Sequence, residues 1–143
     1  MTRVDFYVLP NADPAQRSLL ACRLAEKAYS QGLKVYIHTA SENESQQLDE
    51  LLWTFRQGSF LPHAIHSAND DEPPAILLGH AHEPSSHIDV LINLGAEIPP
   101  FFSRFERVAE LVDQRPELLA QSRERFRFYR ERGYDLNSHQ LKA

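Results

Sequence analysis

Two arginines and a phenylalanine near the C-terminus have the types and spacing to bind a ligand that carries a carboxylate beside an apolar group. Arg123 and Arg130 lie three residues before and four residues after Phe126, so a helix would place all three on one flank. Guanidinium groups bind carboxylates through charge-assisted hydrogen bonds. The same spacing fits a solvated helix face paired to Glu124 and Glu131, and the sequence alone leaves both interpretations open.

The sequence from 115 to 132 predicts the helix that positions these side chains. Asp113 can cap its start, Pro116 suits its first turn, and Gly133 stands where a helix commonly ends. At about 100° per residue, the side of the helix that faces the protein comprises Leu118, Ser122 and Tyr129. Leu119 and Phe126 lie next to this stripe, on one side of it. The two arginines therefore border an apolar surface of this helix.

Other residues that could bind a metal or act in catalysis do not form a convincing metal or catalytic site. His80, His82 and His87 include imidazoles two positions apart, which can share a metal ion on an extended chain, but their spacing matches no zinc-binding pattern. The residue types of a hydrolase triad occur nearby, in Ser85, Ser86, His87 and Asp89. Closeness in sequence is not the geometry that a triad requires. Cys22 lies in mid-helix, away from a cationic cluster, so we expect no thiolate and assign no catalytic residue.

Short apolar segments alternating with helical periodicity indicate an α/β fold. The predicted strands cover 4–9, 33–38, 75–79, 87–94 and 105–112, and a short helix is the alternative for the last of these. A strand, a helix and a strand joined by short connections favour a right-handed crossover and parallel pairing. Residues 67–74 are predicted to form a loop, and the chain after Gly133 to be extended and packed through Tyr134 and Leu136.

The first two helices have clear start signals. Asp13 caps a helix that runs to about Tyr29, and Ser41 with Glu44 matches a capping box at the start of the next helix. The inward stripe of this second helix comprises Leu48, Leu51, Leu52 and Phe55. Trp53 projects away from that stripe, and Phe60 follows in a loop. An exposed pair of this kind is typical of a protein–protein contact, unless a loop or helix covers it.

The turn after the first strand tests for nucleotide binding, because a phosphate would meet a helix N-terminus there. Residues 10–14 hold no glycine, and Asp13 would repel a phosphate. The glycine patterns of dinucleotide-binding and P-loop sites are also absent from the sequence. We therefore expect a single Rossmann-like domain over 1–143, with helices flanking the sheet, no nucleotide-binding glycine motif and no cofactor.

Composition bounds the function further. The chain has 143 residues, 42% of them hydrophobic, with a net charge of −5, which suits one domain and argues against a general nucleic-acid binder. A single cysteine excludes an intrachain disulfide, and no signal-like or membrane-spanning segment occurs. We expect a soluble, cytoplasmic protein without metal or membrane contact.

Five blocks in order resemble the chi subunit family of the bacterial DNA polymerase III holoenzyme. The blocks are Phe6-Tyr7-Val8-Leu9, Leu48-Asp49-Glu50 to Leu52-Trp53, Ser59-Phe60 with Pro62-His63, Asp89-Val90-Leu91-Ile92-Asn93-Leu94, and Arg123-Glu124-Arg125-Phe126 to Tyr129-Arg130 with Gly133-Tyr134-Asp135-Leu136-Asn137. The resemblance implies a non-catalytic accessory subunit of the polymerase complex. Such subunits bind the acidic, phenylalanine-ended C-terminal tail of single-stranded DNA-binding protein, and they pair with the psi subunit, which tethers them to the clamp loader. The resemblance thus implies that the protein contacts DNA only indirectly, through its partner proteins.

The resemblance also assigns residues. Arg123 would pair with the tail's terminal carboxylate or aspartates, Phe126 would wall the apolar site, and Leu119 and Val112 would line it, while the psi-facing positions are matched by Trp53 and Phe60. Where the family's best-known members carry a lysine, this chain has Leu119, which loses one charge and leaves open whether Arg127 or Arg130 compensates. The segment 67–84 matches the family poorly. The alternative function is a small nucleotide- or metal-dependent enzyme acting at the C-terminal edge of the sheet.

Overall fold

The computed structural model describes residues 2–58, 60–67, 72–87 and 89–142. Its elements are β1 (Arg3–Val8), α1 (Pro14–Ser30), β2 (Val35–His38), α2 (Glu42–Thr54), β3 (His63–Ile65), β4 (Ile76–Gly79), β5 (Val90–Asn93), a 3₁₀ turn η1 (Phe102–Arg104), β6 (Arg107–Val112), α3 (Pro116–Glu131) and β7 (Asp135–Gln140). Among the helices of this described part, none is long and apolar enough to cross a membrane.

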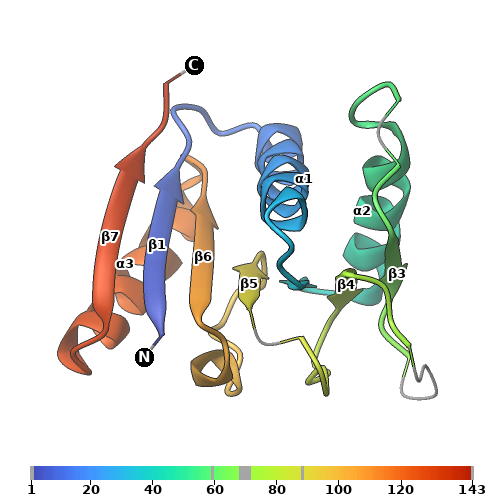
Figure 1. Ribbon diagram of the computed structural model, residues 1–143. Coiled ribbons are helices and arrows are strands. Elements are labelled where there is room, and N and C mark those ends of the chain that lie inside the picture. Colours follow the sequence, from blue (N-terminus) through green and yellow to red (C-terminus); the bar gives the residue numbers. More distant parts are fainter. Residues whose placement is uncertain (1, 59, 68–71, 88, 143) are drawn as a thin grey trace.

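One parallel sheet organises the protein. Its seven strands follow the order β3-β4-β2-β5-β6-β1-β7, and every pairing is parallel. In Figure 1, β7 with β1 forms one edge, β3 with α2 lies at the other, and α3 passes behind β1 and β7. The predicted α/β fold, a parallel sheet with flanking helices, is confirmed.

Alternating side chains build a core on each side of the sheet. Val35 and Ile37 face the cluster under α1 and α2, whereas Tyr36 between them faces the cluster under α3. Leu118 and Tyr129 of α3 lie in this second cluster. Because Ser122 is buried as well, the predicted inward stripe of α3 is confirmed, and its opposite side faces solvent.

The helix starts follow the predicted capping chemistry in two of three cases. The Asp13 carboxylate accepts a hydrogen bond from the amide of Ala15 at 3.0 Å. Ser41 Oγ accepts one from the amide of Glu44 at 3.1 Å, although the Glu44 carboxylate reaches back to the amide before Ser41. The prediction for α3 was wrong, because its cap is Arg115, which makes no side-chain cap hydrogen bond. Asp113 is buried and binds Arg115 instead.

Strand boundaries differ from the predictions in detail. The second and fourth predicted strands shorten to Val35–His38 and Val90–Asn93. The strand favoured at 105–112 is confirmed as β6, and the extended C-terminal segment is a full edge strand, β7. The three residues of β3 were missed, since a strand so short shows no period. Part of the predicted loop at 67–74 lies outside the described residues.

Candidate functional site

One flank of α3 combines apolar side chains with arginines. We define this α3 flank as Leu119, Arg123, Phe126, Arg127 and Arg130. Leu119 and Phe126 are half-buried and pack against the cluster under α3. The Phe126 ring lies 5.3 Å from the ring of Phe6 on β1, tilted by 59°. Val112 is 1% exposed and belongs to the same cluster, so it lies beneath this surface.

The three arginines of the α3 flank differ in their partners. All three are exposed. Arg127 Nη1 lies 3.7 Å from Glu124 Oε1, in an ion pair between two exposed side chains that stabilises little. The guanidinium groups of Arg123 and Arg130 make no hydrogen bond or ion pair with any residue in the described ranges. Two unpaired cations thus stand on either side of a half-buried aromatic ring, which favours the ligand-binding interpretation over a self-paired face.

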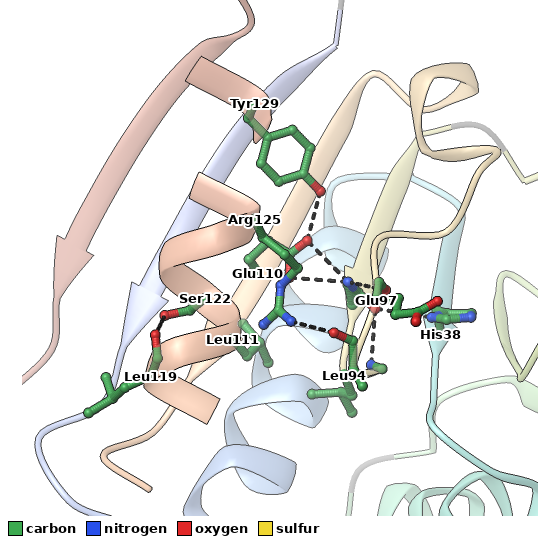
Figure 2. A network of polar contacts seen from close by, with 12 residues as sticks. His38, Leu94, Glu97, Glu110, Leu111, Leu119, Ser122, Arg125 and Tyr129 are labelled. Atoms are coloured by element: carbon green, nitrogen blue, oxygen red, sulfur yellow. Dashed lines mark hydrogen bonds and ion pairs between the residues drawn. The ribbon is translucent and has the colours of Figure 1, made fainter. Parts of the chain in front are cut away.

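Behind the α3 flank lies a buried polar network that sequence reasoning missed (Figure 2). Glu110 on β6 is 0% exposed and Arg125 on α3 is 4% exposed. Arg125 Nε lies 3.0 Å from Glu110 Oε1, and Arg125 Nη1 donates to the carbonyl of Ala96 at 2.8 Å. Tyr129 OH donates to Glu110 Oε2 at 2.7 Å, and Asn93 Nδ2 donates to both carboxylate oxygens at 3.1 and 3.2 Å.

This network fixes how α3 sits on the sheet. Burial raises the pKa of Glu110, and the charge of Arg125 together with the hydrogen bonds from Asn93 and Tyr129 opposes that rise. Because Arg125 points inward, Arg123 and Phe126 on the adjoining helix positions are held on the outer flank. A glutamate within the run 108–112, whose other residues are apolar, was the available signal, since a buried carboxylate requires a partner.

A second surface, the Trp53 face, consists of Trp53 on α2, Phe60 and His63. Trp53 is 56% exposed and Phe60 is 82% exposed, so the described chain covers neither. The Trp53 ring lies 4.6 Å from the ring of His63, whose Nε2 lies 3.0 Å from the carbonyl oxygen of Asp49. The expected exposure of this aromatic pair is therefore confirmed. Since α2 and β3 lie at one edge of the sheet and α3 and β7 at the other, the two surfaces are separate (Figure 1).

The histidine-rich segment forms no metal cluster or triad within the described residues. The rings of His80 and His82 lie 5.5 Å apart. His87 is buried, and its Nε2 lies 2.7 Å from the carbonyl oxygen of Pro74. Asp89 accepts its hydrogen bond from a backbone amide instead of from this imidazole. Ser86 Oγ lies 3.1 Å from His87 Nδ1, but the other nitrogen of that imidazole contacts the carbonyl oxygen of Pro74. Because Asp89 does not bond to the ring, these residues form no Ser-His-Asp triad.

A cavity of 620 Å³ lies at the carboxyl ends of β2, β4 and β5, where α/β enzymes commonly bind ligands. His38 and Phe101 are among its lining residues. His38 Nδ1 lies 3.0 Å from Asn93 Oδ1, and this oxygen also accepts from the amide of Gly95. The cavity therefore adjoins the buried network through Asn93, but it brings together no set of groups with an assignable catalytic role.

The described residues thus form a parallel α/β protein with two separate exposed surfaces, one on α3 and one around Trp53. The family model described as DNA polymerase III chi subunit, HolC, matches residues 1–137. The chain therefore belongs to the family of chi subunits, which are accessory subunits of a replicative DNA polymerase.

Named relatives agree with this assignment. The chain is 50% identical to the DNA polymerase III subunit chi of Pseudomonas aeruginosa, over 99% of this chain and 98% of that protein. It is 30% identical to the subunit of the same name from Escherichia coli, over 96% of this chain and 97% of that protein. The crystal structure of T4 UvsW superposes with a TM-score of 0.70 at 9% identity, over 98% of this chain and 41% of that one, and this likeness shows the fold alone.

Proposed function

We propose that this protein is a non-catalytic adaptor of the DNA polymerase III clamp-loader assembly in the bacterial cytoplasm. The α3 flank would bind the acidic, phenylalanine-ended C-terminal tail of single-stranded DNA-binding protein. The Trp53 face would bind the psi subunit. The observation that carries the proposal is the pair of unpaired guanidinium groups, Arg123 and Arg130, on either side of Phe126.

The chemistry of the α3 flank suits this tail. A C-terminal phenylalanine offers an aromatic ring and a carboxylate on one residue, and the flank offers an aromatic surface beside exposed guanidinium groups. Each charge-assisted hydrogen bond contributes about 1.5–3 kcal/mol. Because all three arginines are exposed, salt will weaken the binding.

Leu119 stands where the family's best-known members carry a lysine, so the site loses one charge unless another arginine supplies it. Arg127 already pairs with Glu124 at 3.7 Å, whereas Arg130 has no partner among the residues described. Arg130 is therefore the better candidate for the missing charge. Leu119 adds apolar surface beside Phe126 instead, which shifts the balance of the site from charge towards hydrophobic contact.

The Trp53 face has the composition of a protein–protein hot spot. Large aromatic side chains lose much water-exposed apolar surface on binding, and they dominate the energetics of many interfaces. Trp53 and Phe60 offer such surface, and His63 supports the Trp53 ring from one side. The alternative of a small nucleotide- or metal-dependent enzyme is not adopted, because no described group of residues has an enzymatic role to assign and the family is that of an accessory subunit.

Calorimetric titration with the acidic tail peptide tests the α3 flank. Arg123→Ala will weaken binding about 10- to 100-fold, the effect of one lost charge-assisted hydrogen bond. Arg23→Ala is the matched control, because Arg23 is an exposed arginine on α1; it will bind as the wild type does. A peptide without its terminal phenylalanine will bind weakly to both. Equal affinities of the Arg123→Ala and Arg23→Ala proteins would refute the assignment.

A further inference from the structure

The strand beside the α3 flank is a free edge of the sheet. β7 is the last strand in the sheet order and pairs, among the described residues, with β1 alone. It spans six residues, Asp135–Gln140, without a proline. The opposite edge strand, β3, spans three residues. An edge strand presents backbone N–H and C=O groups that another extended chain can pair with.

The register shows which backbone groups of β7 point outward. The amide of Leu141 donates to the carbonyl of Val8 at 2.9 Å, and Val8 is in register with Gln140. In a parallel ladder, alternate residues of a strand bond to a given neighbour. The odd-numbered residues of β7 therefore bond to β1. Leu136, Ser138 and Gln140 direct their N–H and C=O groups to the open edge.

The side chains of these same residues face the α3 side of the sheet. Leu136 packs against the cluster under α3, and side chains two residues apart in a strand share a face. Ser138 is in register with Phe6, whose ring contacts Phe126. Leu136 is half-buried, whereas Ser138 and Gln140 are exposed. Helix α3 thus covers the beginning of β7 and leaves its second half open.

An extended peptide on this edge would continue the sheet next to the arginines. Alternate side chains of such a peptide would face the same side as Phe126 and the α3 flank. Three of the five residues of that flank are arginines. The carboxylate of β7 itself, on Asp135, lies on the opposite face by the same alternation. The positive charge of the α3 flank beside the open edge of β7 therefore favours an acidic partner.

We propose that the acidic tail binds as an added strand on the open edge of β7, with its backbone paired to Ser138 and Gln140 and its alternate carboxylates directed to the arginines of the α3 flank. This inference rests on the proposed function, since it states how the same partner binds. Backbone pairing would supply affinity that does not depend on the peptide's side chains, and the arginines would supply selectivity for acidic sequences. The edge that could otherwise pair with a second copy of the chain would be occupied by the partner.

A proline scan of β7 tests the added strand. Ser138→Pro removes an outward N–H, which an edge strand tolerates, and Ser138→Ala removes the hydroxyl while keeping that N–H. We expect Ser138→Pro to weaken peptide binding about tenfold, as for one lost backbone hydrogen bond, and Ser138→Ala to bind like the wild type. Amide hydrogen exchange of Ser138 and Gln140 in the wild-type protein will slow when the peptide is added.

The outcomes separate this inference from the function on which it rests. If Arg123→Ala weakens binding while Ser138→Pro binds like the wild type, and the Ser138 and Gln140 amides gain no protection, the added strand is refuted and the tail site stands. If the wild-type protein does not bind the peptide, both fail together. Circular dichroism checks that Ser138→Pro is folded, and the exchange measurement on the wild type decides the question if it is not.

Discussion

Replacing Arg125 by leucine removes the cation from a carboxylate that has no access to water. Glu110 is 0% exposed, and Arg125 Nε lies 3.0 Å from its Oε1. Breaking a buried ion pair on one side costs about 3–5 kcal/mol, because an uncompensated charge stays behind. Leucine keeps much of the apolar volume of the arginine stem. The stability loss therefore measures mainly the electrostatic part of the network.

The geometry places the loss near the low end of that range. Tyr129 and Asn93 still donate hydrogen bonds to Glu110 after the substitution. Arg125 Nε and Nη2 lack a hydrogen bond of good geometry to the described residues, so their removal forfeits little beyond the charge. We expect Arg125→Leu to destabilise the protein by about 3 kcal/mol and to lower its melting temperature by about 10 °C.

The loss will depend on pH in a defined direction. Burial already raises the pKa of Glu110 above its ordinary value of 4.5, and loss of Arg125 raises it further. A carboxyl group whose pKa is higher in the folded state binds its proton more tightly there, so its stabilising contribution is full below the unfolded pKa and is lost as pH rises. Urea denaturation will therefore show a larger loss at pH 8 than at pH 5.

A double variant provides the control for this prediction. Arg125→Leu combined with Glu110→Gln leaves no charged side chain in the network around residue 110, and glutamine can still bond to Tyr129. The double variant will be more stable than Arg125→Leu at pH 8, and its stability difference from the wild type will vary less with pH. A loss below about 1 kcal/mol for Arg125→Leu, within the range of an exposed ion pair, would refute the network as the anchor of α3.

Three further predictions test other parts of the structure. Burial raises the pKa of Cys22 to about 12, so a thiol reagent at pH 8 will label the protein in urea but not in its native state; rapid native labelling would contradict this. Burial raises the pKa of Asp113, but the hydrogen bonds from Arg115 lower it by more, so this pKa lies below its ordinary value of 3.8. The stabilisation that the ionised carboxylate provides is therefore present above that pH and is lost on acidification. Arg115→Gln will accordingly cost about 1 kcal/mol at pH 7, shrinking towards pH 2, and a constant cost across that range would count against it. Leu119→Lys will tighten tail binding severalfold at low salt and not at high salt, whereas an unchanged titration at low salt would argue that Arg130 already saturates the site.

Local signals predicted what depends on a few neighbouring residues. The caps at Asp13 and Ser41, and the stop at Gly133, whose φ of 76° suits glycine, mark helix ends within one residue or two. Helical spacing predicted the burial of Tyr129 and turned Trp53 away from the sheet, while it left open whether another segment covers Trp53. The two candidate surfaces could therefore be proposed before the strand order was known.

Contacts between distant segments were not predictable. Arg125 looks like one more member of a charged helix face until β6 places Glu110 beneath it. The edge position of β7 depends on pairing with β1, more than 130 residues away in sequence. These features arise from tertiary packing, on which local propensity has no bearing.

The central claim, one adaptor with two separate faces, is tested most directly through the single tryptophan of the chain. Fluorescence of Trp53 will change when the psi subunit is added and will not change when the acidic tail peptide is added, and the peptide's affinity measured by calorimetry will be the same with or without psi. Trp53→Ala will lose psi and keep the peptide, while Arg123→Ala will do the reverse. If saturating peptide displaces psi, or if one substitution abolishes both interactions, the two partners share a surface and the account is wrong.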